Sequence, residues 1–249
     1  MSEKLSVVII TKNEERNIRR CLESVRWADE IVVIDSGSTD KTLSICREYG
    51  CRVVETEWLG FGRTRQLAVE KASNDWILSI DSDEEVSSEL AERIREILSE
   101  KIDKCGFKFK RITFYIGRLI KHSGWNREYC LRLFNRKYGS YNSRDVHEYV
   151  EIKGETGRIE EEIMHYSYHT ISDHLKKIDK YTTLGARQLF NQGKKSSVFK
   201  AILRAKFRFI KMYFINMGFL DGKEGLILAF NSAFYVFLKY IKLWEKHNK

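Results

Sequence analysis

The segment Trp76-Ile77-Leu78-Ser79-Ile80-Asp81-Ser82-Asp83 is the most informative part of the sequence. A short apolar run that ends in two carboxylates is typical of a buried strand, and it predicts that Asp81 and Asp83 lie at the strand's C-terminal end. Oxygen ligands at such an edge suit Mg²⁺ or Mn²⁺, and a metal held this way usually binds substrate phosphates as well. The stretch therefore predicts chemistry on a phosphorylated, nucleotide-activated substrate. Acidic pairs after strands are also common in ordinary turns. The interpretation as a metal site therefore depends on the residues in the other loops that follow strands.

The first hundred residues alternate predicted strands and helices. The strands are Leu5–Ile10, Ile31–Ile34, Arg52–Glu55 and Trp76–Ile80; the helices are Glu14–Val25, Thr39–Tyr49, Gly62–Ala72 and Ser87–Ser99. Ser38 or Thr39 is the expected N-cap of the second helix. This order predicts an α/β fold with a mostly parallel sheet and helices on both faces. Right-handed crossovers then bring all the loops that follow strands to one edge, where ligands bind.

The second half changes character after residue 103. Phe107–Tyr115 and Cys130–Asn135 are predicted strands, residues 171–193 a helix, and residues 197–245 two helices separated by Gly218–Gly222. We therefore expect a domain at residues 1–193, with a nucleotide-binding half (1–103) and an acceptor-binding, catalytic half (104–193). Residues 194–249 form a basic helical tail.

Charge is distributed unevenly along these parts. Residues 1–103 carry a net charge of −7, residues 104–193 carry +7 and residues 194–249 carry +9. A basic tail indicates an anionic partner such as a phospholipid surface, a lipid-linked phosphate or nucleic acid. The five cysteines show neither a CxxC motif nor zinc-ligand spacing, and the N-terminus has no signal-peptide character. Both features favour a reducing, cytosolic compartment.

Each loop that follows a predicted strand carries polar side chains. Thr11-Lys12-Asn13-Glu14-Glu15 follows the first strand, Asp35-Ser36-Gly37-Ser38-Thr39-Asp40 follows the second, and Asp81 and Asp83 follow the fourth. Such residues also serve as ordinary caps and turns. Together on one edge they predict a nucleotide pocket, in which Asp35 bonds a base or ribose and a metal at Asp81 and Asp83 bridges the diphosphate.

These loops also carry a resemblance to a known family. Val7–Glu14, Ile34–Asp40 and Ile80–Glu84 resemble the family 2 glycosyltransferases in order and spacing. The whole chain, over about residues 4–245, is similar to the lipopolysaccharide-core β-glucosyltransferase-like proteins. The matching segments are Glu57–Gly62, Leu131–Phe134, Val146–Glu148, His165–Tyr168 and Phe219–Gly222. The resemblance implies a GT-A fold, a sugar-nucleotide donor, a divalent metal and inversion at the anomeric carbon.

The resemblance also implies roles for particular residues. Donor binding falls to Thr11, Asn13, Glu14, Asp35, Arg65, Asp81, Trp125, Arg132 and His147. Metal binding, of Mn²⁺ or Mg²⁺, falls to Asp81, Asp83 and His165. Glu148 is the expected catalytic base, with Asp145 as its close rival.

Each of these roles has a plainer alternative. Glu148 could be a solvated loop residue, His165 a structural histidine, Trp125 a packed residue in a turn and Arg132 an exposed strand arginine. Gln66 departs from the family, which usually has asparagine there, and this puts one donor-site hydrogen bond in doubt.

The tail contains a basic amphipathic helix. Lys200, Arg204, Arg208 and Lys211 share one face, and Phe199, Leu203, Phe207, Ile210, Phe214 and Met217 share the opposite one. This pattern suits an anionic membrane interface, and the alternative is an apolar stripe packed on the catalytic domain. Gly225–Leu238 is uncharged but shorter than the roughly 20 residues that span a bilayer, which favours an interfacial or re-entrant hairpin.

We therefore expect an inverting hexosyltransferase. It would move a hexose from a nucleotide-sugar such as UDP-glucose to a lipid-linked saccharide such as lipopolysaccharide core. It would be peripheral, on the cytoplasmic face of the inner membrane. The alternatives are a nucleic-acid-binding protein and a non-catalytic sugar-nucleotide binder. Basic residues opposite an apolar stripe favour lipid over nucleic acid, and the intact acidic pair favours catalysis.

Overall fold

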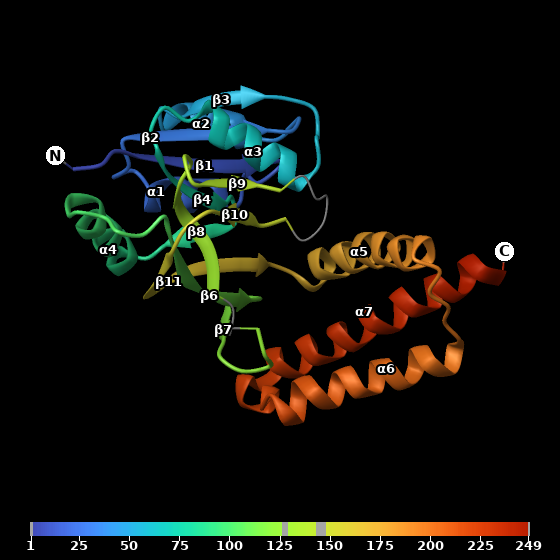
Figure 1. Cartoon of the computed structure of the whole chain (residues 1–249). Helices are drawn as coiled ribbons and strands as arrows, with labels where there is room; N and C mark the ends of the chain where they lie inside the picture. Colours follow the sequence, from blue (N-terminus) through green and yellow to red (C-terminus); the bar gives the residue numbers. More distant parts are fainter. Residues whose placement is uncertain (1, 126–128, 143–147, 249) are drawn as a thin grey trace. The chain divides into compact units, whose positions relative to one another are not determined.

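The computed structural model describes residues 2–125, 129–142 and 148–248 (Figure 1). Two compact units make up the chain. The sheet unit is Met1–Arg111 with Glu128–His165, and the helical unit is Ile112–Arg127 with Tyr166–Lys249. By packing, residues 171–191 therefore group with the tail, whereas the sequence places the boundary at residue 193. The division into a catalytic domain and a tail stays a prediction.

The sheet unit is built on a mixed sheet whose first half is parallel. Its strands are β1 (Leu5–Thr11), β2 (Glu30–Asp35), β3 (Arg52–Glu55), β4 (Trp76–Asp81), β5 (Glu84–Val86), β6 (Gly106–Tyr115), β8 (Tyr129–Asn135) and β11 (Thr156–Tyr168). They lie in the order β3-β2-β1-β4-β8-β6-β11-β5, and β6 and β11 end in the helical unit. β3, β2, β1 and β4 are parallel, whereas β8 runs antiparallel to both β4 and β6.

Helices cover both faces of the parallel strands. They are α1 (Ile18–Ser24), α2 (Thr42–Glu48), α3 (Phe61–Lys71) and α4 (Ser88–Ser99). Alternate strand residues face opposite sides, so Val7 and Ile9 pack with α1, α2 and α4, while Val8 packs with α3. A short ribbon of β9 (Gly139–Tyr141) and β10 (Val150–Ile152) packs on the α3 side. Burial on both faces explains why these strands read as continuous apolar runs.

The expected GT-A-like architecture is therefore present, with differences in detail. α2 begins at Thr42, and its N-cap position is Lys41, with no side-chain cap. The expected cap at Ser38 or Thr39 is wrong, because the Ser38 hydroxyl donates to Asp35 instead. Several strands were not expected from the sequence, among them β5, β9, β10 and β11. They are short, or they lie in a region without strict alternation of apolar residues.

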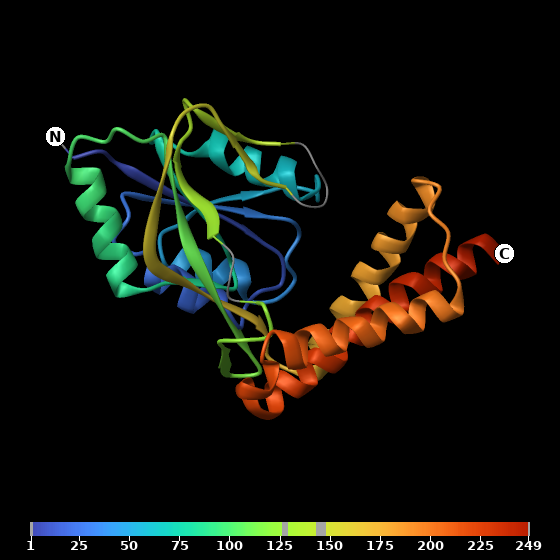
Figure 2. The same cartoon turned by 60° about the horizontal axis from the view of Figure 1, so that its bottom comes forward.

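The helical unit contains the ends of β6 and β11, a short strand and a set of helices (Figure 2). Its elements are β7 (Arg118–Ile120), α5 (Ile171–Asn191), α6 (Val198–Ile210), the π-helical turn η1 (Lys211–Ile215), the 3₁₀ turn η2 (Gly218–Asp221) and α7 (Gly222–Asn248). α6 and α7 pack as a hairpin through the two turns, and α5 packs on α7. The two expected tail helices are confirmed.

Exposed apolar residues are a feature of this unit. The apolar stripe on α6 and η1 faces solvent, with exposed fractions of 70% for Phe199, 62% for Phe207 and 57% for Phe214. Within the described part of the helical unit, the other elements therefore leave the stripe uncovered. Among the described residues, one helical segment, Gly218–Asn248, is long and apolar enough to cross a membrane by length and composition.

Candidate active site

The acidic pair lies at the turn between β4 and β5, at the C-terminal edge of the parallel strands. The registers align Thr11 of β1 with Asp35 of β2, and Ile10 of β1 with Asp81 of β4. The loops after β1, β2 and β4 therefore meet at one edge, as the sequence predicts. β5 begins only three residues after Asp81, so the pair occupies a tight turn.

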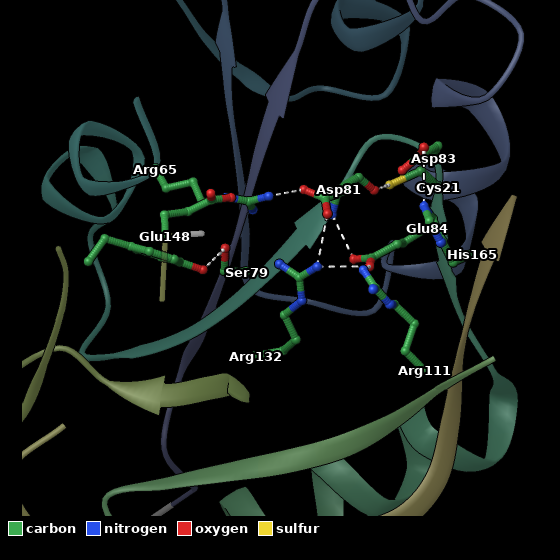
Figure 3. Close-up of polar contacts among 11 residues, drawn as sticks. Cys21, Arg65, Ser79, Asp81, Asp83, Glu84, Arg111, Arg132, Glu148 and His165 are labelled. Carbon is green, nitrogen blue, oxygen red and sulfur yellow. Dashed lines mark hydrogen bonds and ion pairs between the residues drawn. The ribbon is translucent and has the colours of Figure 1, made fainter. Parts of the chain in front are cut away.

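Two arginines bind the Asp81 carboxylate (Figure 3). Arg65 of α3 donates from Nη2 to Oδ1, and Arg132 of β8 donates from Nη2 to Oδ2 at 2.8 Å. Burial alone would raise the pKa of Asp81, but Arg65 and then Arg132 outweigh it and hold that pKa well below its usual range. Asp81 is therefore a carboxylate at any physiological pH. Arg132 is 8% exposed, so its alternative reading as an exposed strand arginine is wrong.

The two arginines connect Asp81 to further carboxylates. Arg65 Nε donates to Glu148 Oε1 at 3.2 Å, and Arg132 Nη2 also donates to Glu84 Oε1 at 2.8 Å. Arg111 of β6 lies 3.7 Å from the same Glu84 oxygen. Three arginines thus face three carboxylates in one network. Glu148 belongs to it, which argues against a freely solvated loop residue.

Glu84 and Arg111 were missed as site residues. Glu84 has no exposed surface, and its Oε2 accepts from the Asp81 amide at 2.9 Å, so it holds the turn in place. The sequence did offer a reason to include Glu84, since this residue follows the acidic pair directly. Arg111 gave no signal, because only the packing of β6 and β8 brings it near.

Asp83 points away from this network, toward β11. Its Oδ2 lies 3.4 Å from His165 Nε2, and both side chains are partly exposed (Figure 3). Antiparallel pairing of β5 with β11 sets His165 opposite Glu84, one residue from Asp83. The expected three-ligand set is therefore divided. Asp83 and His165 lie together, whereas both Asp81 oxygens accept from arginines.

No group of three or more His, Cys, Asp or Glu side chains among the described residues is arranged to hold a metal ion. Asp83 and His165 still fit a divalent metal as two protein ligands. Mg²⁺ commonly takes one or two carboxylates and completes its coordination shell with substrate phosphates and water. The metal assignment of Asp81, Asp83 and His165 stays a prediction.

The loops after β1 and β2 are tied together by side chains. The backbone N–H of Asn13 donates to Ser38 Oγ at 2.8 Å. The side-chain Oδ1 of Asn13 accepts from the backbone N–H of Thr39 at 2.7 Å. The Glu14 amide donates to Thr42 Oγ1 at 2.8 Å. Asn13 has a positive φ of 55°, which asparagine tolerates better than most residues. In this arrangement Asn13 and Glu14 shape the loop.

Asp35 organises the second loop. It has no exposed surface, and one of its oxygens accepts from the amides of Gly37 and Ser38 at 2.9 and 2.8 Å. Its other oxygen accepts from the Ser38 hydroxyl at 2.5 Å. Both oxygens therefore have partners within the loop, so a bond to a base or ribose would have to share or replace one of them.

Some buried polar atoms near this edge have no hydrogen-bond partner among the residues that the structure describes. They are Thr11 Oγ1, Ser36 Oγ, Arg65 Nη1 and Arg132 Nε. Native proteins leave few buried polar groups unsatisfied, and such groups often mark functional sites. Thr11 and Ser36 lie at the ends of β1 and β2, and Arg65 and Arg132 are the two arginines that bind Asp81 at the end of β4. A ligand at this edge could supply the missing partners after a small rearrangement.

Two further residues that the sequence singles out, Trp125 and Gln66, have contacts in the structure. Trp125 packs in the helical unit, with its ring 6.1 Å from Tyr115 and 6.3 Å from Tyr168. Gln66 Oε1 accepts from the Tyr141 amide at 2.9 Å, so it fastens β9 to α3. Asp145 and His147 lie outside the described residues.

Comparison with known proteins gives a consistent result. A model described as "Glycosyl transferase family 2" matches residues 6–149. The lipopolysaccharide core biosynthesis glycosyltransferase LpsC of Rhizobium meliloti (strain 1021) is 32% identical over 250 residues, which cover 98% of this chain and 93% of LpsC. An uncharacterized glycosyltransferase of Rickettsia conorii is 32% identical over 266 residues, which cover 100% of this chain and 93% of that protein.

A solved structure supports the fold. The crystal structure of S. aureus TarS matches with a TM-score of 0.51 at 18% identity, over 85% of this chain and 44% of that chain. At this identity the likeness concerns the fold alone.

Proposed function

This chain belongs to glycosyl transferase family 2, and on that premise we propose that it is an inverting, metal-assisted hexosyltransferase. The donor would be a nucleotide-sugar, UDP-glucose, and the acceptor a lipid-linked saccharide such as lipopolysaccharide core. The observation that carries this proposal is the turn after β4, where Asp81 joins two buried arginines while Asp83 faces His165. The name of the relative LpsC supports the choice of acceptor.

Arg65 and Arg132 would bind the donor together with Asp81. Arg65 Nη1 and Arg132 Nε are buried and have no hydrogen-bond partner in the described ranges 2–125, 129–142 and 148–248, so each guanidinium has a donor left for a further acceptor. The planar guanidinium matches phosphate geometry well. Asp81 would hold both arginines in place, and Thr11, Asn13, Glu14 and Asp35 would shape the nucleoside side of the pocket.

Asp83 and His165 would hold the Mn²⁺ or Mg²⁺ ion. The 3.4 Å between Asp83 Oδ2 and His165 Nε2 allows both side chains to approach one ion. When bound, such an ion stabilises the negative charge of a diphosphate leaving group. The two ligands would come from the β4–β5 turn and from the neighbouring strand β11, which pairs with β5.

Glu148 would act as the general base. It would take the proton from the acceptor hydroxyl while that oxygen forms a bond to the anomeric carbon. The bond from the anomeric carbon to the diphosphate oxygen breaks on the opposite face, and its electron pair leaves with UDP. Attack opposite the leaving group inverts the anomeric centre. Arg65 contacts both Asp81 and Glu148, so it would keep the base at a fixed position beside the donor.

Residues 194–249 would act as a membrane-associating tail on a transferase domain of residues 1–193. α6 exposes Phe199 and Phe207 by 70% and 62%, and its two lysines, Lys200 and Lys206, are exposed as well. Such a helix lies in the plane of an anionic interface. We infer peripheral association with the cytoplasmic face of the inner membrane, where a lipid-linked acceptor would be presented.

The test is release of UDP from UDP-glucose, with Mn²⁺ and truncated lipopolysaccharide core as acceptor. Thermal stabilisation by a panel of sugar nucleotides would identify the donor first, since ligand binding to the folded state raises the melting temperature. We expect Glu148→Gln to lower kcat by about 10²–10⁴-fold while retaining stabilisation by the donor. Asp83→Asn should lose both turnover and the metal-dependent part of that stabilisation.

Asp103→Asn is the matched control, because it removes an exposed carboxylate of the same type. Turnover by Asp83→Asn that equals turnover by the control, at the same metal concentration, would refute the metal assignment. Donor stabilisation without any turnover, across all acceptors, would favour a non-catalytic sugar-nucleotide binder.

A further inference from the structure

A cluster of cations lies between the long helices of the helical unit. The cation cluster consists of Arg204 and Arg208 of α6 and Lys239 of α7. Arg204 Cζ lies 4.6 Å from the centre of the Tyr240 ring, and Lys239 Nζ lies 5.5 Å from the centres of the Tyr235 and Tyr240 rings. The rings of Tyr235 and Tyr240 thus form cation–π contacts with Arg204 and Lys239.

The cluster carries like charges, and two of them, on Arg208 and Lys239, are partly withdrawn from water. Burial lowers the pKa of Lys239, and repulsion from Arg204 and Arg208 lowers it further. Burial likewise lowers the pKa of Arg208. Across residues 2–125, 129–142 and 148–248, no carboxylate forms an ion pair with any of the three. Three crowded cations without a counter-charge cost free energy, which a bound anion would offset.

A neighbouring lysine shows the ordinary arrangement. Lys242, one turn further along α7, lies 2.7 Å from Asp179 Oδ1 and donates to the hydroxyls of Thr182 and Thr183 at 2.9 and 2.8 Å. α5 therefore supplies Lys242 with a counter-charge. Opposite Lys239 the same helix presents Gly185 instead.

Gly185 makes room for the lysine stem. A Cβ at position 185 would lie 3.0 Å from Lys239 Cδ, tighter than ordinary contact. Glycine in a helix interior is destabilising relative to alanine. At this position the glycine allows the close approach of Lys239 to α5, so the lysine is held in the cluster by packing on one side and by aromatic rings on the other.

We propose that the cation cluster binds a phosphate group. Arginine forks match phosphate oxygens in pairs, and lysine adds a point charge. The two sources of that chemistry are free inorganic phosphate and the headgroup of an anionic phospholipid. The exposed Leu203 and Phe207 on the same helix, at 49% and 62%, are suited to lipid chains beside such a headgroup. This site deepens the membrane part of the proposed function and is independent of sugar transfer.

The test compares three forms of the full chain without any sugar nucleotide. They are the wild type, Arg208→Gln/Lys239→Gln, and the control Lys200→Gln/Lys206→Gln, which removes two exposed charges from α6. One arm measures the melting temperature with and without inorganic phosphate at constant ionic strength. The other measures flotation with phosphatidylcholine vesicles that do or do not contain phosphatidylglycerol.

We expect the cluster variant to bind phosphatidylglycerol vesicles about tenfold more weakly than the control variant, because hydrogen bonds to a charged group are lost in addition to net charge. Without anions its melting temperature should equal or exceed that of the wild type, since repulsion is relieved. Stabilisation of the wild type by phosphate alone indicates the free anion, and a response only to vesicles indicates the headgroup. The single variant Arg204→Gln repeats both measurements. Because Arg204 is exposed, its replacement should not impair folding.

Equal responses of the cluster and control variants in both arms would overturn the proposal. The same holds for a wild type that responds to neither phosphate nor phosphatidylglycerol. Because no donor, metal or acceptor is present, neither outcome depends on whether the chain transfers hexose.

Discussion

Replacing Arg132 by methionine should lower the free energy of unfolding by about 3 kcal/mol. Arg132 is 8% exposed, and its Nη2 lies 2.8 Å from both Asp81 Oδ2 and Glu84 Oε1. Breaking a buried ion pair typically costs about 3–5 kcal/mol, since the remaining charge is left without its partner. The lower end applies here, because Asp81 keeps Arg65 and Glu84 keeps Arg111 at 3.7 Å.

The assay is equilibrium unfolding in urea and by heat. For a chain of this size about 3 kcal/mol corresponds to a melting temperature lower by about 6–12 °C. Arg47→Met is the matched control, because Arg47 forms a similar pair with Glu55 in which both side chains are about 60% exposed. Exposed pairs contribute little, so this variant should unfold near the wild type.

A double variant gives the sharper test. Arg132→Met/Glu84→Met removes both charges of the most buried pair, and replacing such a pair by apolar residues is often neutral. We expect it to regain at least half of the stability that Arg132→Met loses. If Arg132→Met is no less stable than Arg47→Met, or if the double variant is the least stable of all, the reasoning about a buried, mutually dependent network is refuted.

Three other predictions concern the helical unit. Burial and then Lys177 lower the pKa of His174 to about 4. The pKa of His174 in the folded state lies below its unfolded value of about 6.5. Its contribution to the free energy of unfolding is therefore complete above pH 6.5 and falls by about 3 kcal/mol as the pH falls toward 4. His174→Gln should flatten the dependence of urea unfolding on pH across that window, and parallel curves would contradict this. Asp221→Ala should cost about 2–4 kcal/mol in thermal unfolding and expose the loop at His122 to proteolysis, because the buried Asp221 accepts from the His122 amide at 3.0 Å. An unchanged digestion pattern would count against that role. Phe207→Ser should weaken flotation with anionic vesicles about tenfold at unchanged stability, since a 62% exposed ring is lost from the interface; vesicle binding equal to the wild type would argue against the α6 stripe as the contact surface.

The strands and helices of the first hundred residues were largely predictable, because their signal is local. Apolar runs such as Val7–Ile10 are buried on both faces, and α4 follows a helical apolar spacing with Ser87 Oγ accepting from the Leu90 amide at its start. The start of α2 was not predictable in this way. Which of several neighbouring serines, threonines and aspartates caps a helix depends on loop contacts such as that between Ser38 and Asp35.

The candidate site was predictable only as a set of residues. Asp81, Asp83, Arg65 and Glu148 were singled out by motif and family resemblance, and the role of each stays a prediction. Their pairing was not predictable. Glu84 directly follows the acidic pair, yet no neighbouring residue in the sequence indicates that it is fully buried against Arg132.

The family, the alternation of strands and helices, and the position of the acidic pair at a strand end follow from the amino-acid sequence alone, because apolar periodicity and short motifs are properties of neighbouring residues. The contacts of Arg65 and Arg132 with Asp81, and of Asp83 with His165, 82 positions further along the chain, arise only when the chain folds. Helix packing likewise leaves the apolar stripe of α6 facing solvent, while Arg204 of the same helix lies over the Tyr240 ring of α7. The physical reason is the same in each case. Which side chains meet depends on strand register and on the rotation of packed helices, and these are settled by the burial of the whole core.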